Sequence, residues 1–159
     1  MPQALCLMIL ETKIPPPLVV LILAAAMWLA ALGAPAFAFR LPLNEFVAGS
    51  IALVGLVLNI YPKFLFNRAG TSINPMRPDA AASLVTSGIY RYTRNPMYLG
   101  HALLLLGMAA HLCNGLSFLA LPLHLLYITR FQIRPEERAL SMRFPHEYAA
   151  YVKAVPRWV

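Results

Sequence analysis

The sequence predicts an all-α integral membrane protein with about four transmembrane helices and a C-terminal helix on the cytoplasmic side. Of its 159 residues, 60% are hydrophobic and only 12% are charged, whereas soluble domains carry about 25% charged residues. Several uncharged runs are also long enough for helices that cross a hydrocarbon core of roughly 30 Å. Because the chain is short, we expect a single domain over residues 1–159.

The first two membrane helices are expected over residues 18–39 and 46–66. The first run contains no charged residue and follows a proline-rich segment at 14–17, and prolines suit the first turn of a helix. The second run is interrupted only by Lys63, whose long side chain can reach the membrane surface. Small residues in this run favour close packing against a neighbouring helix in lipid; they are Ala48, Gly49, Ser50, Ala52 and Gly55.

The second half of the chain predicts a loop, a helical hairpin and a tail. Residues 67–94 are rich in Gly, Pro, Ser, Thr and Asn, which is typical of a loop outside the hydrocarbon. Residues 95–130 have no acidic residue, lysine or arginine before the last position. As one helix this stretch would be roughly 50 Å long, so we expect a hairpin of two helices that turns at 111–115. Residues 134–159 are charged and predict a cytoplasmic tail with a helix that begins at Pro135.

Basic residues set the expected orientation of the chain. They are concentrated in the N-terminal segment, the 67–94 loop and the tail, and only Arg40 falls in the first loop. The positive-inside rule therefore predicts a multi-pass protein whose N and C termini are both cytoplasmic. On this interpretation the net charge of +7 serves topology and attraction to anionic lipid, and we expect no nucleic-acid partner. We also expect no metal site, and the sequence leaves the oligomeric state open.

The loop and the tail carry the polar side chains that could form a site, and the predicted topology brings both to the mouth of the helices. They contribute an arginine, carboxylates, amides and aromatic rings: Tyr90, Arg94, Asn95 and Tyr98 from one, and Gln132, Arg134, Glu136 and Glu137 from the other. Charged groups can bind the ends of a zwitterionic cofactor, while aromatic faces can bind its ring. The pattern therefore indicates a binding site beside an apolar interior.

Each group also has a purely structural interpretation. The tyrosines could form an aromatic belt at the membrane surface, and the arginines could only determine topology. The glutamates could complement a helix dipole or form exposed ion pairs. The histidines are more typical of packed or hydrogen-bonded residues than of metal ligands, although His101 lies near the mouth and remains a candidate.

Three ordered motifs resemble one family of membrane enzymes. They are LVTSGIYRYTRNPMYLG at 84–100, RPEERAL at 134–140 and FPHEYAAYVKAVPR at 144–157. Together they are similar to the isoprenylcysteine carboxyl methyltransferase and phospholipid methyltransferase superfamily. The resemblance implies a compact helical membrane fold and S-adenosylmethionine as methyl donor. It also implies a cofactor pocket between the loop before the hairpin and the helix after it.

The resemblance implies a set of cofactor-binding residues, namely Ser83, Leu84, Val85, Tyr90, Asn95, Pro96, Met97, Tyr98 and Glu136. Among them, Glu136 should hold the amino group of the cofactor. Gln132, Arg134 and His101 are expected to face the substrate. Arg134 and Glu137 are the expected catalytic residues, with Glu137 as the base if the acceptor is an amine.

The implied function is methyl transfer to a lipophilic or lipid acceptor at the cytoplasmic membrane face. The acceptor group could be a carboxylate, a thiol or an amine, and the first two need no base once they are ionised. Two alternatives stay open at this point. One is an NADPH-dependent membrane reductase related to the sterol reductases, and the other is a membrane scaffold without enzymatic activity.

Overall fold

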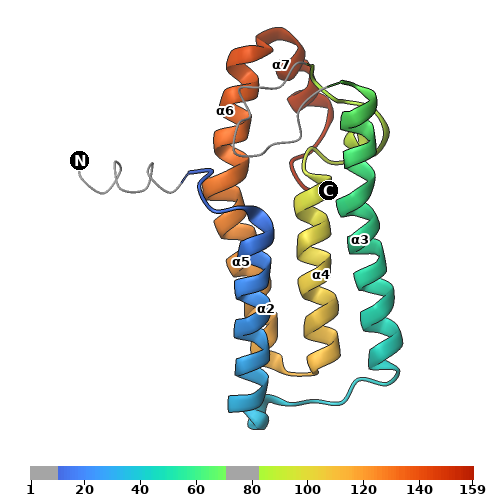
Figure 1. The fold of residues 1–159 in the computed structure, drawn as a ribbon, viewed down its shortest axis with the longest axis vertical. Coiled ribbons are helices and arrows are strands. Elements are labelled where there is room, and N and C mark those ends of the chain that lie inside the picture. The colour runs from blue at the N-terminus through green and yellow to red at the C-terminus, as the bar shows by residue number, and fades with distance from the viewer. Residues whose placement is uncertain (1–10, 71–82) are drawn as a thin grey trace, which may run out of the picture.

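Apolar helices that lie side by side dominate the fold (Figure 1). The computed structural model describes residues 11–70 and 83–159, and within these ranges it contains helices and connections but no β-strand. The long axis of the molecule is followed by α2 (Pro16–Gly33), α3 (Asn44–Arg68), α4 (Pro96–Leu112) and α5 (Ala120–Ile128). The expected all-α fold is confirmed.

The outer surfaces of these helices are suited to lipid. Large apolar side chains on α2 and α3 are exposed, among them Leu21, Leu29 and Leu53, and soluble proteins rarely expose such continuous apolar surfaces. Three helical segments are long and apolar enough to cross a membrane: Pro16–Gly33, Asn44–Arg68 and Gly115–Arg143. The shorter α4 has 17 residues, about 26 Å at 1.5 Å per residue, and it contacts α2, α3 and α5. The chain is therefore a membrane protein built around α4.

Glycines let α3 and α4 approach each other at backbone distance. A Cβ atom added at Gly100 would lie 2.6 Å from the carbonyl oxygen of Gly55, and one added at Gly55 would lie 2.8 Å from the carbonyl oxygen of Gly100. Gly107 packs in the same way against Ala48. The small residues noted in the sequence thus include three that form this contact, Ala48, Ala52 and Gly55, whereas a Cβ atom added at Gly49 would have nothing within 4 Å.

The first helix ends earlier than the predicted residue 39. The helix α2 stops at Gly33, and a short 3-10 turn, η1 (Pro35–Phe37), follows it. Pro35 has no backbone N–H, and its ring disfavours a helical conformation at Ala34, whose φ and ψ are −133° and 64°. The connection is held to the opposite turn, because the Asn114 side chain donates to the Ala34 carbonyl oxygen at 3.0 Å.

The hairpin turns within the predicted 111–115 range. Cys113 adopts a left-handed conformation with φ of 46°, and the side chain of Asn114 accepts a hydrogen bond from the Leu116 amide at 3.0 Å. A 3-10 helix, η4 (Gly115–Leu119), then leads into α5. The asparagine provides the turn because its short side chain can replace the backbone partner that the first amides lack.

The helix after the hairpin does not end near residue 130 as predicted. It continues through a π-helical turn, η5 (Thr129–Ile133), into α6 (Arg134–Arg143). Pro135 lacks the N–H that would bond to the carbonyl oxygen of Phe131 four residues earlier, and this oxygen accepts from the amide of Thr12 at 3.0 Å. Pro135 therefore introduces a π-bulge into a continuous helix instead of starting a new one.

The remaining helices lie beyond the N-terminal end of α4 (Figure 1). A 3-10 turn, η3 (Gly88–Arg91), precedes α4, and α7 (Pro145–Ala154) follows α6. Of the predicted 67–94 loop, residues 71–82 lie outside the described ranges. The chain after α7 returns to the start of α4, since the Arg94 amide donates to the Pro156 carbonyl oxygen at 3.0 Å.

Candidate cofactor cavity

A cavity of about 420 Å³ lies where α6, α7, the end of α3 and the start of α4 meet. It is lined by all the residues predicted to bind the cofactor: Ser83, Leu84, Val85, Tyr90, Asn95, Pro96, Met97, Tyr98 and Glu136. His101 and Glu137 also line it. Its volume falls in the range of about 300–1,000 Å³ that small-molecule sites occupy.

Several lining residues were not predicted from the sequence. They come from α3, α7 and the segment that leads into the first turn of α2: Pro15, Pro16, Pro17, Asn59, Lys63, Phe66, Tyr148 and Tyr151. Arg94, which the sequence placed among the polar residues of the site, lines the cavity as well. The proline run was noted only as a helix start, and the tyrosines of α7 belong to the third motif. No spacing in the sequence indicates that these segments reach the same cavity.

The start of α4 faces the cavity and is fixed from two sides. Pro96 occupies its first turn, so the free amides of the following residues form the positive end of the helix dipole there. The side-chain Nδ2 of Asn95 donates to the Arg157 carbonyl oxygen at 2.9 Å, and the backbone N–H of Asn95 donates to the Thr93 hydroxyl at 3.2 Å. The cavity therefore has a rigid edge with hydrogen-bond donors.

Glu136 is a carboxylate without a cation. The Tyr98 hydroxyl donates to its Oε1 atom at 2.5 Å, and in the described part of the chain no arginine, lysine or histidine forms an ion pair with it. Burying a carboxylate without a positive partner is costly. The geometry is therefore suited to a ligand that brings a positive charge.

The adjacent Glu137 is in the opposite situation. Its Oε1 lies 2.9 Å from Nη1 of Arg94, and Arg157 donates to its two oxygens from Nε at 3.0 Å and from Nη2 at 2.7 Å. The hydrogen bonds that Arg157 donates to Glu137 raise the pKa of Arg157. Glu137 thus ties the C-terminal segment to the start of α4 and has no free oxygen facing a substrate.

Arg94 keeps one donor unused. Its Nη1 also donates to the Tyr148 hydroxyl at 3.2 Å, while its buried Nε has no hydrogen-bond partner in the described part of the chain. Arg94 therefore offers a charged donor at the cavity wall, 11% exposed and already oriented by Glu137.

The aromatic wall is built from packed tyrosines. The rings of Tyr90 and Phe66 meet edge to face, with centroids 5.6 Å apart, and the Tyr151 hydroxyl donates to the Tyr90 carbonyl oxygen at 2.7 Å. Burial raises the pKa of the Tyr90, Tyr148 and Tyr151 hydroxyls. These residues are neutral near pH 7 and present ring faces to the cavity.

Comparison with known proteins identifies the family. The model of the phospholipid methyltransferase family matches residues 43–147, which is more than half of the chain and includes α3, α4, α5 and α6. The chain belongs to the phospholipid methyltransferase family. The match covers the first two motifs on which the sequence resemblance was based and the first four residues of the third, so that resemblance is confirmed.

Named relatives lie within the same group of membrane enzymes. Protein-S-isoprenylcysteine O-methyltransferase B of Arabidopsis thaliana is 27% identical over 110 residues, covering 69% of this chain and 56% of that protein. The human protein-S-isoprenylcysteine O-methyltransferase is 28% identical over 113 residues, covering 67% of this chain and 40% of the human protein. An uncharacterized Haemophilus influenzae protein is 40% identical over 63 residues, covering 40% of this chain and all of that protein.

The chain thus spans about half the length of the curated methyltransferases that it matches. No solved structure matches it significantly.

Two residues predicted to face the substrate lie elsewhere in this family member. Gln132 is fully buried in the π-helical turn, and its Nε2 donates to the Ile14 carbonyl oxygen at 2.8 Å. Arg134 is exposed and lines a separate groove instead of the cavity. The π-bulge explains this outcome, because it changes the register between η5 and α6 relative to a continuous α-helix.

The segment that leads into α2 forms a strap across the π-bulge. We use strap for residues 11–17, of which the last two belong to the first turn of α2. Glu11 is 13% exposed and forms ion pairs with Arg130, at 2.7 Å, and with Arg138. The amide of Thr12 and the carbonyl of Ile14 are bonded to η5 as described above. These contacts hold Pro15–Pro17 against the cavity, so the strap forms part of its wall.

Proposed function

We propose that this protein transfers a methyl group from S-adenosylmethionine to a lipophilic acceptor that reaches the cavity from the membrane. The observation that carries the proposal is the carboxylate of Glu136, which faces an aromatic cavity and has no cationic partner among the described residues. Family membership and the printed names of the relatives support methyl transfer as the reaction. The positive-inside rule supports a cytoplasmic position for the cavity and for both termini.

The donor groups of the cavity fit the parts of S-adenosylmethionine. Glu136 would hold the ammonium group by a charge-assisted hydrogen bond. The amides at the start of α4 and the unused Nε of Arg94 would hold the carboxylate. The faces of Tyr90, Tyr98 and Tyr148 would pack against the adenine ring and the sulfonium.

When bound, S-adenosylmethionine would supply an electrophilic methyl group to the nucleophile of the acceptor, with S-adenosylhomocysteine as the leaving group. The chain itself positions the reactants and excludes water from the apolar wall. Neither glutamate of the cavity is free to act as a base, because Glu137 is held by two guanidinium groups and Glu136 is assigned to the cofactor. We therefore propose an acceptor that is already ionised, such as a carboxylate or thiolate, and the words O-methyltransferase in the printed names of the relatives favour the carboxylate.

Lys63 and His101 are the polar side chains best placed for the acceptor. Both line the cavity from the interface of α3 and α4, where they would not compete with Glu136 and Arg94 for the cofactor. Lys63 could balance the negative charge of an ionised acceptor. This assignment replaces Gln132 and Arg134 in the proposed substrate site.

Binding of S-adenosylhomocysteine tests the cofactor site. The purified protein in detergent should bind this product saturably in isothermal titration calorimetry, and Glu136→Gln should weaken binding by about tenfold or more, because a hydrogen bond to a charged group contributes about 1.5–3 kcal/mol. Glu147→Gln is the matched control, since Glu147 is exposed on α7 and does not line the cavity. Wild-type protein that fails to bind, or a Glu136→Gln variant that binds like wild type, would contradict the proposal. Saturable binding of NADPH in place of the product would favour the reductase alternative.

A further inference from the structure

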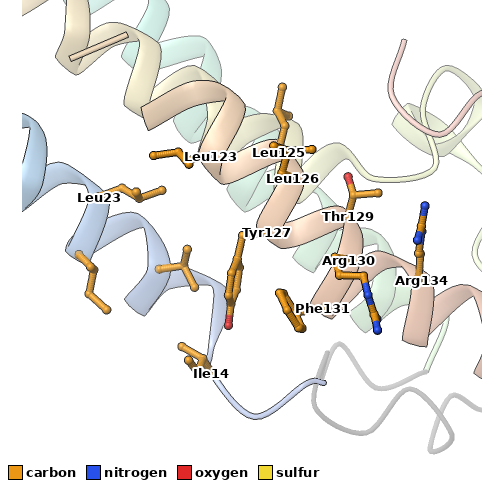
Figure 2. Close-up of a pocket in the computed structure, with 12 residues that line it drawn as sticks. Ile14, Leu23, Leu123, Leu125, Leu126, Tyr127, Thr129, Arg130, Phe131 and Arg134 are labelled. Carbon is orange, nitrogen blue, oxygen red and sulfur yellow. The ribbon is translucent and has the colours of Figure 1, made fainter. Parts of the chain in front are cut away.

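A second, larger space lies on the side of the strap away from the cofactor cavity. This groove has a volume of about 820 Å³ and runs between α2 and the helix formed by α5 and η5. Figure 2 shows Leu23 on one side, Leu123 and Leu126 on the other, and Thr129, Arg130 and Arg134 further along. One end of the groove is thus apolar and the other end is basic.

The basic end carries more positive charge than its neighbours neutralise. Arg130, Arg134 and Arg138 recur every four residues and so lie along one side of the helix. Glu11 is shared by Arg130 and Arg138, whereas Arg134 is exposed and forms no ion pair with any described residue. The exposed Lys13 on the strap adds a further positive charge. An anionic group at this end would complete the charge balance.

The groove is separate from the cofactor cavity. The two spaces share no lining residue. Ile14 faces the groove, whereas Pro15–Pro17, the next residues of the strap, face the cavity. A molecule in the groove would therefore be divided from the proposed methyl donor by the strap, and its polar end would lie at the arginines instead of Glu136.

We propose that this groove binds an anionic phospholipid of the surrounding bilayer. The lipid phosphate is bound by Arg134, with Arg130 beside it, because a guanidinium donates two parallel hydrogen bonds to phosphate oxygens. One acyl chain lies along the exposed side chains of Ile22 and Leu126 and the partly buried Leu23. The site is independent of methyl transfer, and the basic residues that surround it favour a leaflet rich in anionic lipid.

Lipid titration by native mass spectrometry tests the site in the full-length, detergent-purified protein. Phosphatidylglycerol should bind more tightly than phosphatidylcholine with the same acyl chains. Arg134→Gln should lower the affinity for phosphatidylglycerol by about fivefold, which is the contribution of one basic residue near an anionic surface, and lower that for phosphatidylcholine less, because the choline ammonium already balances the charge of its phosphate. Leu126→Trp, which fills the apolar end, should weaken binding of both lipids. Arg91→Gln is the control, because Arg91 is exposed and lines neither space.

Three outcomes would overturn the proposal. The first is an Arg134→Gln variant that retains phosphatidylglycerol like wild type, or an Arg91→Gln variant that loses it equally. The second is soluble glycerol phosphate binding as tightly as the lipid, which would make the site a phosphate site without a lipid tail. The third is a gain of one methyl group by the bound lipid after S-adenosylmethionine is added, which would make it the acceptor. Each readout is a mass or an affinity, so it remains informative if the protein does not bind the cofactor.

Discussion

Replacing Glu137 with glutamine should lower the free energy of unfolding by about 2–4 kcal/mol. Its carboxylate makes three short contacts with two arginines, and removing one partner from a buried ion pair costs about 3–5 kcal/mol. Glu137 is 19% exposed and Arg94 is 11% exposed, so that contact is only weakly screened. Arg157 is 36% exposed, so its contact is screened by solvent and contributes less, about 1 kcal/mol.

A double-mutant cycle isolates the interaction with Arg157. Arg157→Gln alone should cost about 1 kcal/mol, and the double variant should cost less than the sum of the single changes, by about 1 kcal/mol, because the two residues contact each other. Unfolding by sodium dodecyl sulfate in mixed micelles, followed by tryptophan fluorescence, measures all three variants against wild type. If the unfolding costs of the two single variants add up to that of the double variant within about 0.3 kcal/mol, Glu137 and Arg157 do not stabilise each other and the reasoning is refuted.

The same variants show whether Glu137 has a structural role, as the partner of Arg94 and Arg157, or acts as a catalytic base. If Glu137 only holds Arg94 and Arg157 in place, the Glu137→Gln protein should lose stability and activity together. The Arg157→Gln protein should then show smaller losses of both. A base would give a different result: Glu137→Gln would abolish methyl transfer with no change in unfolding, while Arg157→Gln stayed fully active. That result would contradict the assignment made from the three hydrogen-bonding contacts.

Two further predictions concern the packing that positions the cavity. Gly100→Ala should cost about 1–3 kcal/mol in the same unfolding assay, because its new Cβ would lie 2.6 Å from the Gly55 carbonyl oxygen; Gly49→Ala, with nothing within 4 Å, should be neutral or stabilising by up to about 1 kcal/mol. Wild-type stability should fall as the pH rises above about 10, because burial raises the pKa of Tyr151 and the folded state therefore favours its neutral form. Tyr151→Phe should flatten that alkaline slope, and an unchanged slope would assign it to other groups.

The sequence predicted the cavity wall well because the family motifs are local. Residues 83–85, Tyr90 and residues 95–98 follow one another along a loop and the first turn of a helix, so their shared position depends on short-range geometry. The contribution of α3 and of the strap could not be predicted in this way. Lys63 was interpreted as a residue that reaches the membrane surface, and nothing in its spacing shows that α3 extends past the start of α4 toward the cavity.

The main discrepancy arose from a single proline. Pro135 was taken as a helix start because proline favours the first turn, and that rule holds only when the preceding residues are not helical. Here α5 supplies a continuous helix, and the carbonyl oxygen that Pro135 cannot satisfy is bonded by Thr12, from the strap at the other end of the chain. The sequence around Pro135 contains no sign of that partner. The π-bulge nevertheless explains two separate features: it turns Gln132 toward the strap and places Arg134 at the groove, so the strap is fixed between the two spaces that the proposed cofactor and the proposed lipid would occupy.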